Sequence, residues 1–308
     1  MQQKSILKLL TKQEKSPAKY TLIQYFHLTS FKKISKEFKI KQNPYPLGVN
    51  ANFFFKSKNT EKWWEELQKK AGEKFYKKNG LKKVITEHEK VYNQFNTYSK
   101  TLNVFIKKMK KAEEASLIEG MLTKVLEIEL EKNNYFNQPP FELLKFINPP
   151  VTKATEDKIK ASKLKSSKQI GEKYGWLEAK TLLSKGSTEA GKLIQEKLKQ
   201  ENIQKLKENI KANKGFIKEY EKSITKKLKI FSENARELNY LTLSAHKYII
   251  MGRFKNKKLL YNKGINAEDF LYLLPWEFKK QDKEKVKQRK NKKHILLINS
   301  KEELEEFN

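Results

Sequence analysis

Residues 216–261 read FIKEYEKSITKKLKIFSENARELNYLTLSAHKYIIMGRFKNKKLLY and carry the clearest helical pattern in the chain. Apolar side chains recur there every three or four residues, which places them on one face of an α-helix. Such a long stripe is typical of an antiparallel bundle or a coiled-coil arm. The stripe consists of Tyr220, Ile224, Leu228, Phe231, Ala235, Leu238, Leu241, Ala245 and Tyr248.

Helical patterns also fill most of the chain before this stretch. Thr60, an N-cap residue type, predicts the start of one helix. A second helix follows Gly80 and carries an apolar stripe up to Met109, and a third runs from about Ala112 to Lys132, so the two form a helical hairpin. Further lysine-rich helices are expected at 154–168, 170–184 and 188–212.

Two regions read as β-structure. Residues 20–28 and 52–55 are rich in aromatic side chains and are separated by turn residues at 43–48, which predicts a short antiparallel element. Residues 295–298 predict one short strand near the C-terminus, and 300–303 then match the start of a helical turn. We therefore expect a mainly α fold: a long antiparallel helical bundle with a small β element near the N-terminus and a short C-terminal strand.

Two proline pairs mark the expected domain boundary. Pro139-Pro140 and Pro149-Pro150 prevent a continuous helix on either side of them, so residues 139–152 are expected to form a hinge. The chain then divides into residues 1–138, with the β element and the helical hairpin, and residues 153–308, with the long helical bundle.

The composition is strongly basic. The 308 residues include 67 Lys and Arg against 36 Asp and Glu, a formal net charge of +31. Such a charge indicates either a polyanion partner such as nucleic acid or a lysine-rich surface that is in contact only with solvent. Cysteine is absent, which excludes disulfides and thiolate metal sites. No apolar run reaches the length of a membrane span, so we expect a cytoplasmic protein without a membrane partner.

Arginine is rare within this basic set. It occurs only at Arg236, Arg253 and Arg289, and the other basic residues are lysine. Because a guanidinium group offers a planar fork of donors that an ammonium group lacks, arginine retained in a lysine-rich chain suggests a position where that fork is needed. Chance placement of three residues is the alternative.

Signatures of catalysis are missing. Glycine is sparse, and no glycine-rich phosphate-binding motif or nucleophile elbow occurs. The four histidines, at 27, 88, 246 and 294, are far apart and lack the spacing of metal ligands. We therefore predict no catalytic residue, metal or cofactor. The aromatic residues 53–55 and 63–64 suggest either core packing or a platform for stacking bases.

The C-terminal third resembles a known family. The residues Ser232–Asn239, then Arg253, then Ala267–Glu277, and finally Val286–Arg289 resemble the helical segment of phosphoenolpyruvate-utilising proteins related to phosphoenolpyruvate synthase and rifampicin phosphotransferase. The segment from Lys173 to Leu177 is similar to a Tyr-x-Trp pattern upstream in the same family.

This resemblance implies a helical module that binds the acceptor molecule or scaffolds a phosphotransfer system. The phosphohistidine motif and the ATP-grasp domain of the family are absent from this sequence, so the resemblance implies separately encoded partners that carry them and a chain that is not active alone. The residues expected to contact a small-molecule acceptor or a partner are Arg236, Glu237, Arg253, Tyr174, Trp176 and Asp269.

Two other functions compete with this reading. A lysine-rich helical protein could bind nucleic acid non-specifically, in which case binding would depend steeply on salt. A structural coiled-coil interaction protein would instead associate with itself and bind no ligand.

Overall fold

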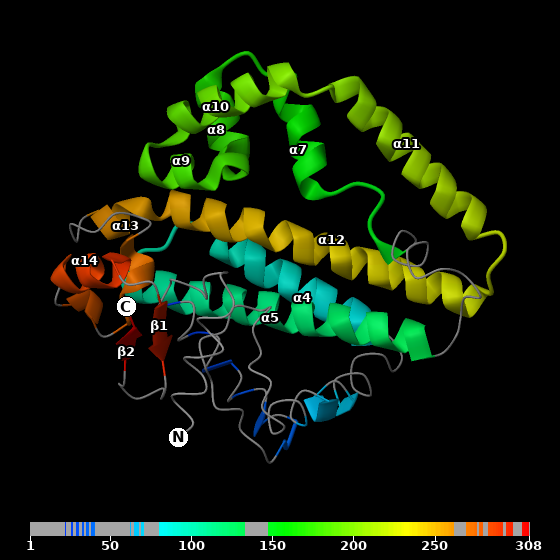
Figure 1. Cartoon of the computed structure of the whole chain (residues 1–308), viewed down its shortest axis with the longest axis horizontal. Helices are drawn as coiled ribbons and strands as arrows, with labels where there is room; N and C mark the ends of the chain where they lie inside the picture. The colour runs from blue at the N-terminus through cyan, green and yellow to red at the C-terminus, as the bar shows by residue number, and fades with distance from the viewer. Residues whose placement is uncertain are drawn as a thin grey trace. The chain divides into compact units, whose positions relative to one another are not determined.

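A computed structural model gives the fold (Figure 1). It describes residues 80–132, 147–261, 269–275, 277–279, 283–291, 294–297 and 304–307, together with the positions 22, 26, 29–30, 33, 35–36, 38–40, 62, 65–67 and 69–70. Most of these residues are helical, so the expected mainly α fold is confirmed.

The described residues belong to two compact units. One comprises residues 72–258, and the other comprises residues 1–71 with 259–308. The predicted boundary at 139–152 falls within the unit of residues 72–258 and therefore does not separate these two units.

Three long helices form the centre of the first unit. Helices α4 (Gly80–Phe95), α5 (Leu102–Lys132) and α12 (Lys226–Lys255) each pack against the other two (Figure 1). Aromatic rings fill the space between them: Tyr92 stacks on Tyr248 with ring centroids 5.5 Å apart, and Phe95 stacks on Phe105 at 5.6 Å. The helical hairpin expected from the periodicity is therefore present.

The turn of this hairpin lies earlier than predicted. The expected helix from Gly80 to Met109 is interrupted at residues 96–101, between α4 and α5. Thr97 donates its hydroxyl to the carbonyl of Gln94, and the Thr101 hydroxyl accepts from the amide of Val104. Threonine hydroxyls that bond to nearby backbone in this way end and start helices, and the apolar periodicity does not register them.

Shorter helices lie beside this centre within the same unit. They are α7 (Lys153–Ala161), α8 (Ser167–Tyr174), the 3-10 helix η1 (Gly175–Glu178), α9 (Ala179–Ser184) and α10 (Ser187–Gln200). Two glycines bring α8 and α10 into close contact: a Cβ atom on Gly171 would lie 1.7 Å from the Ser187 carbonyl oxygen, and one on Gly191 would lie 1.8 Å from that of Ser167. No residue larger than glycine fits at this crossing.

The long helix predicted at 216–261 is divided into three. Helix α11 (Ile203–Tyr220) ends before a turn at 221–225, α12 follows, and Asn256 separates α12 from α13 (Lys257–Tyr261). The helix predicted at 188–212 is divided as well, because the Asn202 side chain accepts from the amide of Lys205 and caps α11. The apolar spacing continues across these breaks, which explains why periodicity alone missed them.

The second unit contains the C-terminal elements. These are η2 (Asp269–Tyr272), η3 (Glu277–Lys279), α14 (Lys283–Asn291), and the strands β1 (His294–Leu297) and β2 (Leu304–Phe307), which pair antiparallel with His294 opposite Phe307. Residues 304–307 are therefore a strand at the point where the capping pattern predicted a helical turn.

The predicted β element at 20–28 is wrong for the positions that the structure describes. Leu22 and Phe26 are helical and buried, as is Ser30 four residues later. This spacing by four places all three on one helical face, so the aromatic run follows a helical period. Residues 52–55, the other half of the predicted element, lie outside the described residues.

The described helices include none that is both long enough and apolar enough to cross a bilayer.

Candidate binding cavity

A cavity of about 460 Å³ opens between α4, α12 and the segment 149–151 that contains the second proline pair. Its volume lies in the range of roughly 300–1,000 Å³ that is usual for small-molecule sites. Apolar and charged side chains share its wall: Lys82, Ile85, Thr86, Glu89, Pro149, Pro150, Val151, Arg236, Glu237, Tyr240 and Leu241. The two predicted residues Arg236 and Glu237 are therefore part of one cavity.

Arg236 reaches this cavity already bound to a carboxylate. Its guanidinium donates to Glu221 across 2.5 Å, and 11% of the Arg236 side chain is exposed. Glu221 also lies 3.7 Å from the ammonium of Lys229. An anionic ligand at Arg236 would have to displace Glu221, so this arginine serves first to join the turn after α11 to α12.

The acidic side chains of the cavity are differently placed. Glu89 and Glu237 are exposed, and neither forms an ion pair with a residue in the described part of the chain. They make hydrogen-bond acceptors available to a ligand.

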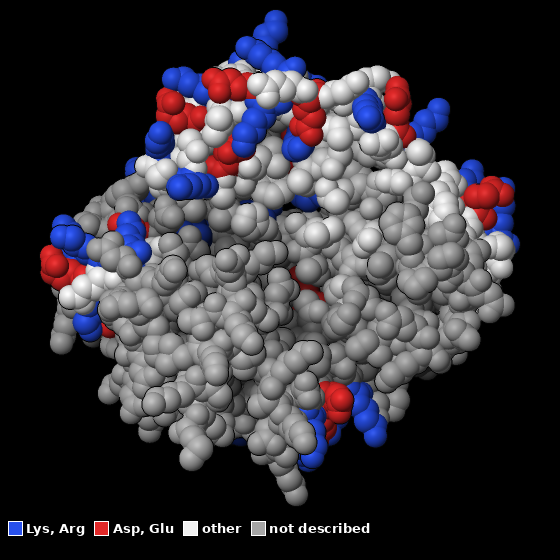
Figure 2. Space-filling view, in the orientation of Figure 1, with Lys and Arg blue, Asp and Glu red and all other residues white. Residues whose placement is uncertain are grey.

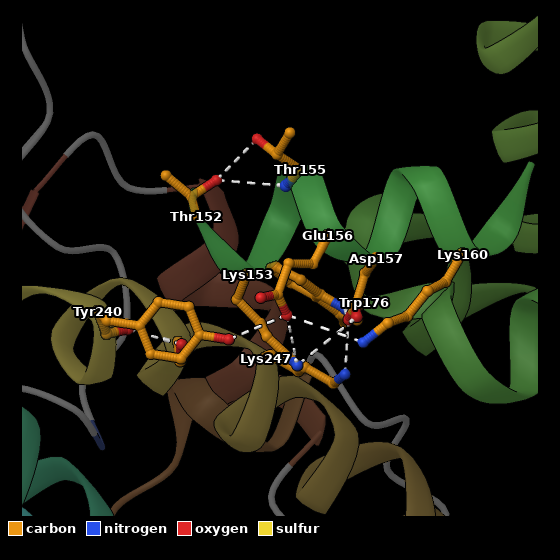
Figure 3. Close-up of polar contacts among 10 residues, drawn as sticks. Thr152, Lys153, Thr155, Glu156, Asp157, Lys160, Trp176, Tyr240 and Lys247 are labelled. Carbon is orange, nitrogen blue, oxygen red and sulfur yellow. Dashed lines mark hydrogen bonds and ion pairs between the residues drawn. The ribbon is translucent and has the colours of Figure 1, made fainter. Parts of the chain in front are cut away.

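Tyr240 connects the cavity to a polar cluster on α7 (Figure 3). Its hydroxyl donates to Glu156 across 3.0 Å, and Glu156 also accepts from Lys153 at 3.1 Å. Burial acts to raise the pKa of Glu156, but the hydrogen bonds from Lys153 and Tyr240 outweigh it and lower that pKa. Burial raises the pKa of Tyr240. The phenol therefore stays neutral and keeps its proton directed at Glu156.

Asp157 is the buried centre of the same cluster. Only 1% of it is exposed, and it accepts from the ammonium of Lys247 at 2.5 Å and from the indole of Trp176 at 2.9 Å. Lys153 lies 3.9 Å away. Figure 3 shows these side chains converging from α7, η1 and α12. The contacts of Tyr240 with Glu156 and of Lys247 with Asp157 fasten α7 to α12.

The other predicted residues lie in several places. Trp176 is buried in this cluster, and the Tyr174 ring lies 6.0 Å from the Lys247 ammonium. Arg253 is buried in α12. The burial of His246, together with the positive charge of Arg253, lowers the pKa of His246. Asp269 belongs to the second unit and forms an ion pair with Lys290. The structure thus brings together Arg236 with Glu237, and Tyr174 with Trp176.

A buried triad in the three-helix centre escaped the sequence reasoning. Glu119 of α5 has a fully buried side chain, with His88 at 2.9 Å and the hydroxyl of Tyr92 donating at 3.0 Å. Burial raises the pKa of Glu119, and burial with the nearby Glu119 charge raises that of Tyr92. One sequence signal existed, because Glu119 is four residues after Ala115 and three before Leu122, on the apolar face of α5.

Metal binding has no support in the part of the chain that the structure describes, where no three His, Asp or Glu side chains form a ligand set. Comparison of the chain with family models, with curated proteins and with solved structures finds no match.

Proposed function

We propose that the unit of residues 72–258 is a non-catalytic module that binds a small molecule in the cavity between α4 and α12. The observation that carries this proposal is the shared wall: Arg236 and Glu237, selected from the sequence as ligand contacts, line one cavity of suitable volume.

The chemistry of the wall favours a ligand that donates hydrogen bonds. Arg236 binds Glu221, and Tyr240 directs its proton at Glu156, so both side chains already have an acceptor within the protein. The carboxylates of Glu89 and Glu237 have no ion-pair or hydrogen-bond partner among the described residues and can accept hydrogen bonds from a ligand. Ile85 and Leu241 supply apolar surface. A molecule with hydroxyl or ammonium groups on an apolar body would satisfy both kinds of surface.

The resemblance to phosphoenolpyruvate-utilising proteins gives this molecule a role. In that reading it is the acceptor of a phosphoryl group, and the chain acts as the acceptor-binding or scaffolding module in the cytoplasm. Separately encoded ATP-grasp and phosphohistidine proteins would supply the chemistry. Hydroxyl-bearing acceptors agree with the donor-rich ligand inferred above. Purification of the chain from its native host, followed by identification of bound proteins, tests this part.

The binding proposal itself is tested by nuclear magnetic resonance with methyl labelling. The methyl groups of Ile85, Val151 and Leu241 lie in the cavity wall and report occupancy directly. The probes are three fragments that share a phenyl ring and carry a hydroxymethyl, an aminomethyl or a carboxylate group. We expect the first two to shift these methyl signals and the carboxylate to bind more weakly.

The matched variants are Glu237→Gln, in the wall, and Glu233→Gln, one helical turn earlier on α12 and outside it. Glu237→Gln should weaken binding of the aminomethyl fragment by about 5- to 30-fold, because it removes one charge-assisted contact worth ~1–2 kcal/mol. Glu233→Gln should leave the affinity unchanged. Absence of shifts at the three methyl groups with all fragments would refute the proposal.

A further inference from the structure

Two lysine-rich segments without a single acidic residue meet at one end of the three-helix centre. Neither residues 90–112 nor residues 238–258 contain Asp or Glu. The Asn256 side chain joins them: it donates to the carbonyl of Thr97 at 3.1 Å and accepts from the amide of Ser99 at 2.8 Å. Lys255 adds a hydrogen bond to the carbonyl of Asn96. The α4–α5 turn and the end of α12 therefore lie side by side (Figure 1) and contribute to one surface.

Six lysines of this surface form no ion pair with a carboxylate among the residues described. They are Lys100, Lys107, Lys108, Lys255, Lys257 and Lys258. We call this surface the basic end.

Lysines elsewhere in the unit are often neutralised. Lys192 pairs with Glu189 and Lys197 with Glu178, and Figure 2 shows blue and red side chains intermixed over the region of α8 to α10. Paired charges of this kind attract a polyanion weakly, because each cation is already compensated. The basic end therefore presents uncompensated positive charge.

The same surface exposes an aromatic ring. Tyr98, in the turn, is 61% exposed and is the most exposed large hydrophobic residue described, and Val104 on the first turn of α5 is 43% exposed. Tyr98 falls within the stretch from Gly80 to Met109 that was predicted to carry an apolar stripe, yet it lies outside the core. The turn backbone that carries Tyr98 is fixed by Asn256 and by Lys108, which donates to the Tyr98 carbonyl at 3.2 Å.

We propose that the basic end is a binding site for single-stranded nucleic acid. Lysine ammonium groups would contact successive phosphates, and Tyr98 would stack on an unpaired base, with Val104 beside it. Rigid aromatic rings among cations are how proteins hold single strands without reading sequence. A duplex keeps its bases stacked within it and offers Tyr98 no free face, so single strands should bind more tightly. This site is separate from the cavity and independent of the function proposed for it.

Fluorescence anisotropy of labelled oligonucleotides tests the proposal. The probes are oligo-dT and oligo-U of about 20 nucleotides and a duplex of equal length, each at several salt concentrations up to about 150 mM. We expect both single strands to bind more tightly than the duplex. Tyr98→Ala should weaken single-strand binding by about 5- to 150-fold, since stacking contributes ~1–3 kcal/mol per base.

A pair of triple variants with equal change in net charge separates this site from a general charge effect. Lys100→Gln with Lys107→Gln and Lys258→Gln lies in the basic end, and all three lysines are exposed. The control is the exposed set Lys199, Lys205 and Lys211, also changed to Gln. The first triple should reduce the slope of log affinity against log salt by about 2, because each single-strand phosphate contact contributes about 0.7. The control should change it little.

Three outcomes would overturn the proposal: equal loss in both triples, an unchanged affinity in Tyr98→Ala, or duplex binding as tight as that of the single strands. The circular dichroism spectrum and the unfolding midpoint of each variant must match those of the wild type, which is expected for exposed positions. Binding to phosphatidylserine vesicles that competes fully with oligo-dT and survives Tyr98→Ala would assign the surface to a membrane instead.

Discussion

Replacing Lys247 by Met tests whether the cluster around Asp157 stabilises the first unit. The methionine keeps most of the apolar stem but removes the ammonium that donates to Asp157 across 2.5 Å. Asp157 is 1% exposed, so water cannot replace the lost partner. Loss of one member of a buried ion pair costs ~3–5 kcal/mol. The Trp176 indole at 2.9 Å and Lys153 at 3.9 Å still face the carboxylate. We therefore expect a loss of ~2–3 kcal/mol, below the full range.

The measurement is urea unfolding followed by far-ultraviolet circular dichroism, with Lys180→Met as the control. Lys180 is exposed on α9 and has no ion-pair partner within the described ranges, so its replacement should change the free energy of unfolding by less than ~0.5 kcal/mol. A double-mutant cycle with Asp157→Asn isolates the pair, because Asn still accepts from Trp176. The coupling should reach at least ~1.5 kcal/mol. A coupling below ~0.5 kcal/mol would show that the pair behaves like a solvent-exposed one.

Three further predictions concern other contacts. Arg289→Lys should lower the stability of the second unit by ~2 kcal/mol, because one ammonium cannot reproduce the two contacts of the guanidinium with Glu277 at 2.6 and 2.9 Å. The rate of amide hydrogen exchange of residues 283–291 should therefore rise. Burial acts to raise the pKa of Glu277, but the hydrogen bonds from Arg289 outweigh it and lower that pKa from 4.5. The ionised carboxylate therefore stabilises the fold above about pH 4.5, and this stabilisation is lost as the pH falls further. The stability difference between wild type and Glu277→Gln should shrink between about pH 5 and pH 3. Gly191→Ala should lower the free energy of unfolding in urea by more than ~2 kcal/mol, because its Cβ would lie 1.8 Å from the Ser167 carbonyl oxygen. Gly215→Ala, which has open space around it, should instead raise the free energy of unfolding by ~0.5–1 kcal/mol.

The helical parts of the fold were predictable because burial on one face leaves a period in the sequence. Leu238, Leu241 and Ala245 follow that period on α12 and are buried. The breaks at 96–101 and 221–225 were missed because apolar spacing continues through them. Side-chain hydrogen bonds of Thr97 and Thr101 mark the first of these breaks, and one of Asn202 marks the start of α11; these residue types also occur inside helices. Apolar periodicity therefore identifies helices more readily than it identifies their ends.

The candidate site was predictable only where its residues are neighbours in the chain. Arg236 and Glu237 are adjacent on α12 and line one cavity. The partners that define their chemistry are distant: Glu221 lies beyond a turn, and Glu156 reaches Tyr240 from another helix. Pairing across helices depends on rotation and crossing angle, which periodicity does not specify. The pair of His88 and Glu119, which are 31 residues apart, escaped for the same reason.

The three arginines carry information different from that expected of them. Arg289 is 1% exposed and Arg253 is 7% exposed, and Arg236 keeps 11% of its side chain exposed. Both Arg236 and Arg289 bind a glutamate of their own unit. A planar fork of donors is most needed where water cannot complete the hydrogen bonds, which is the interior. Arginine in this lysine-rich chain therefore marks buried positions. Charge available to a ligand is then more reliably sought among lysines that lack a carboxylate, and the basic end collects six of them on one surface.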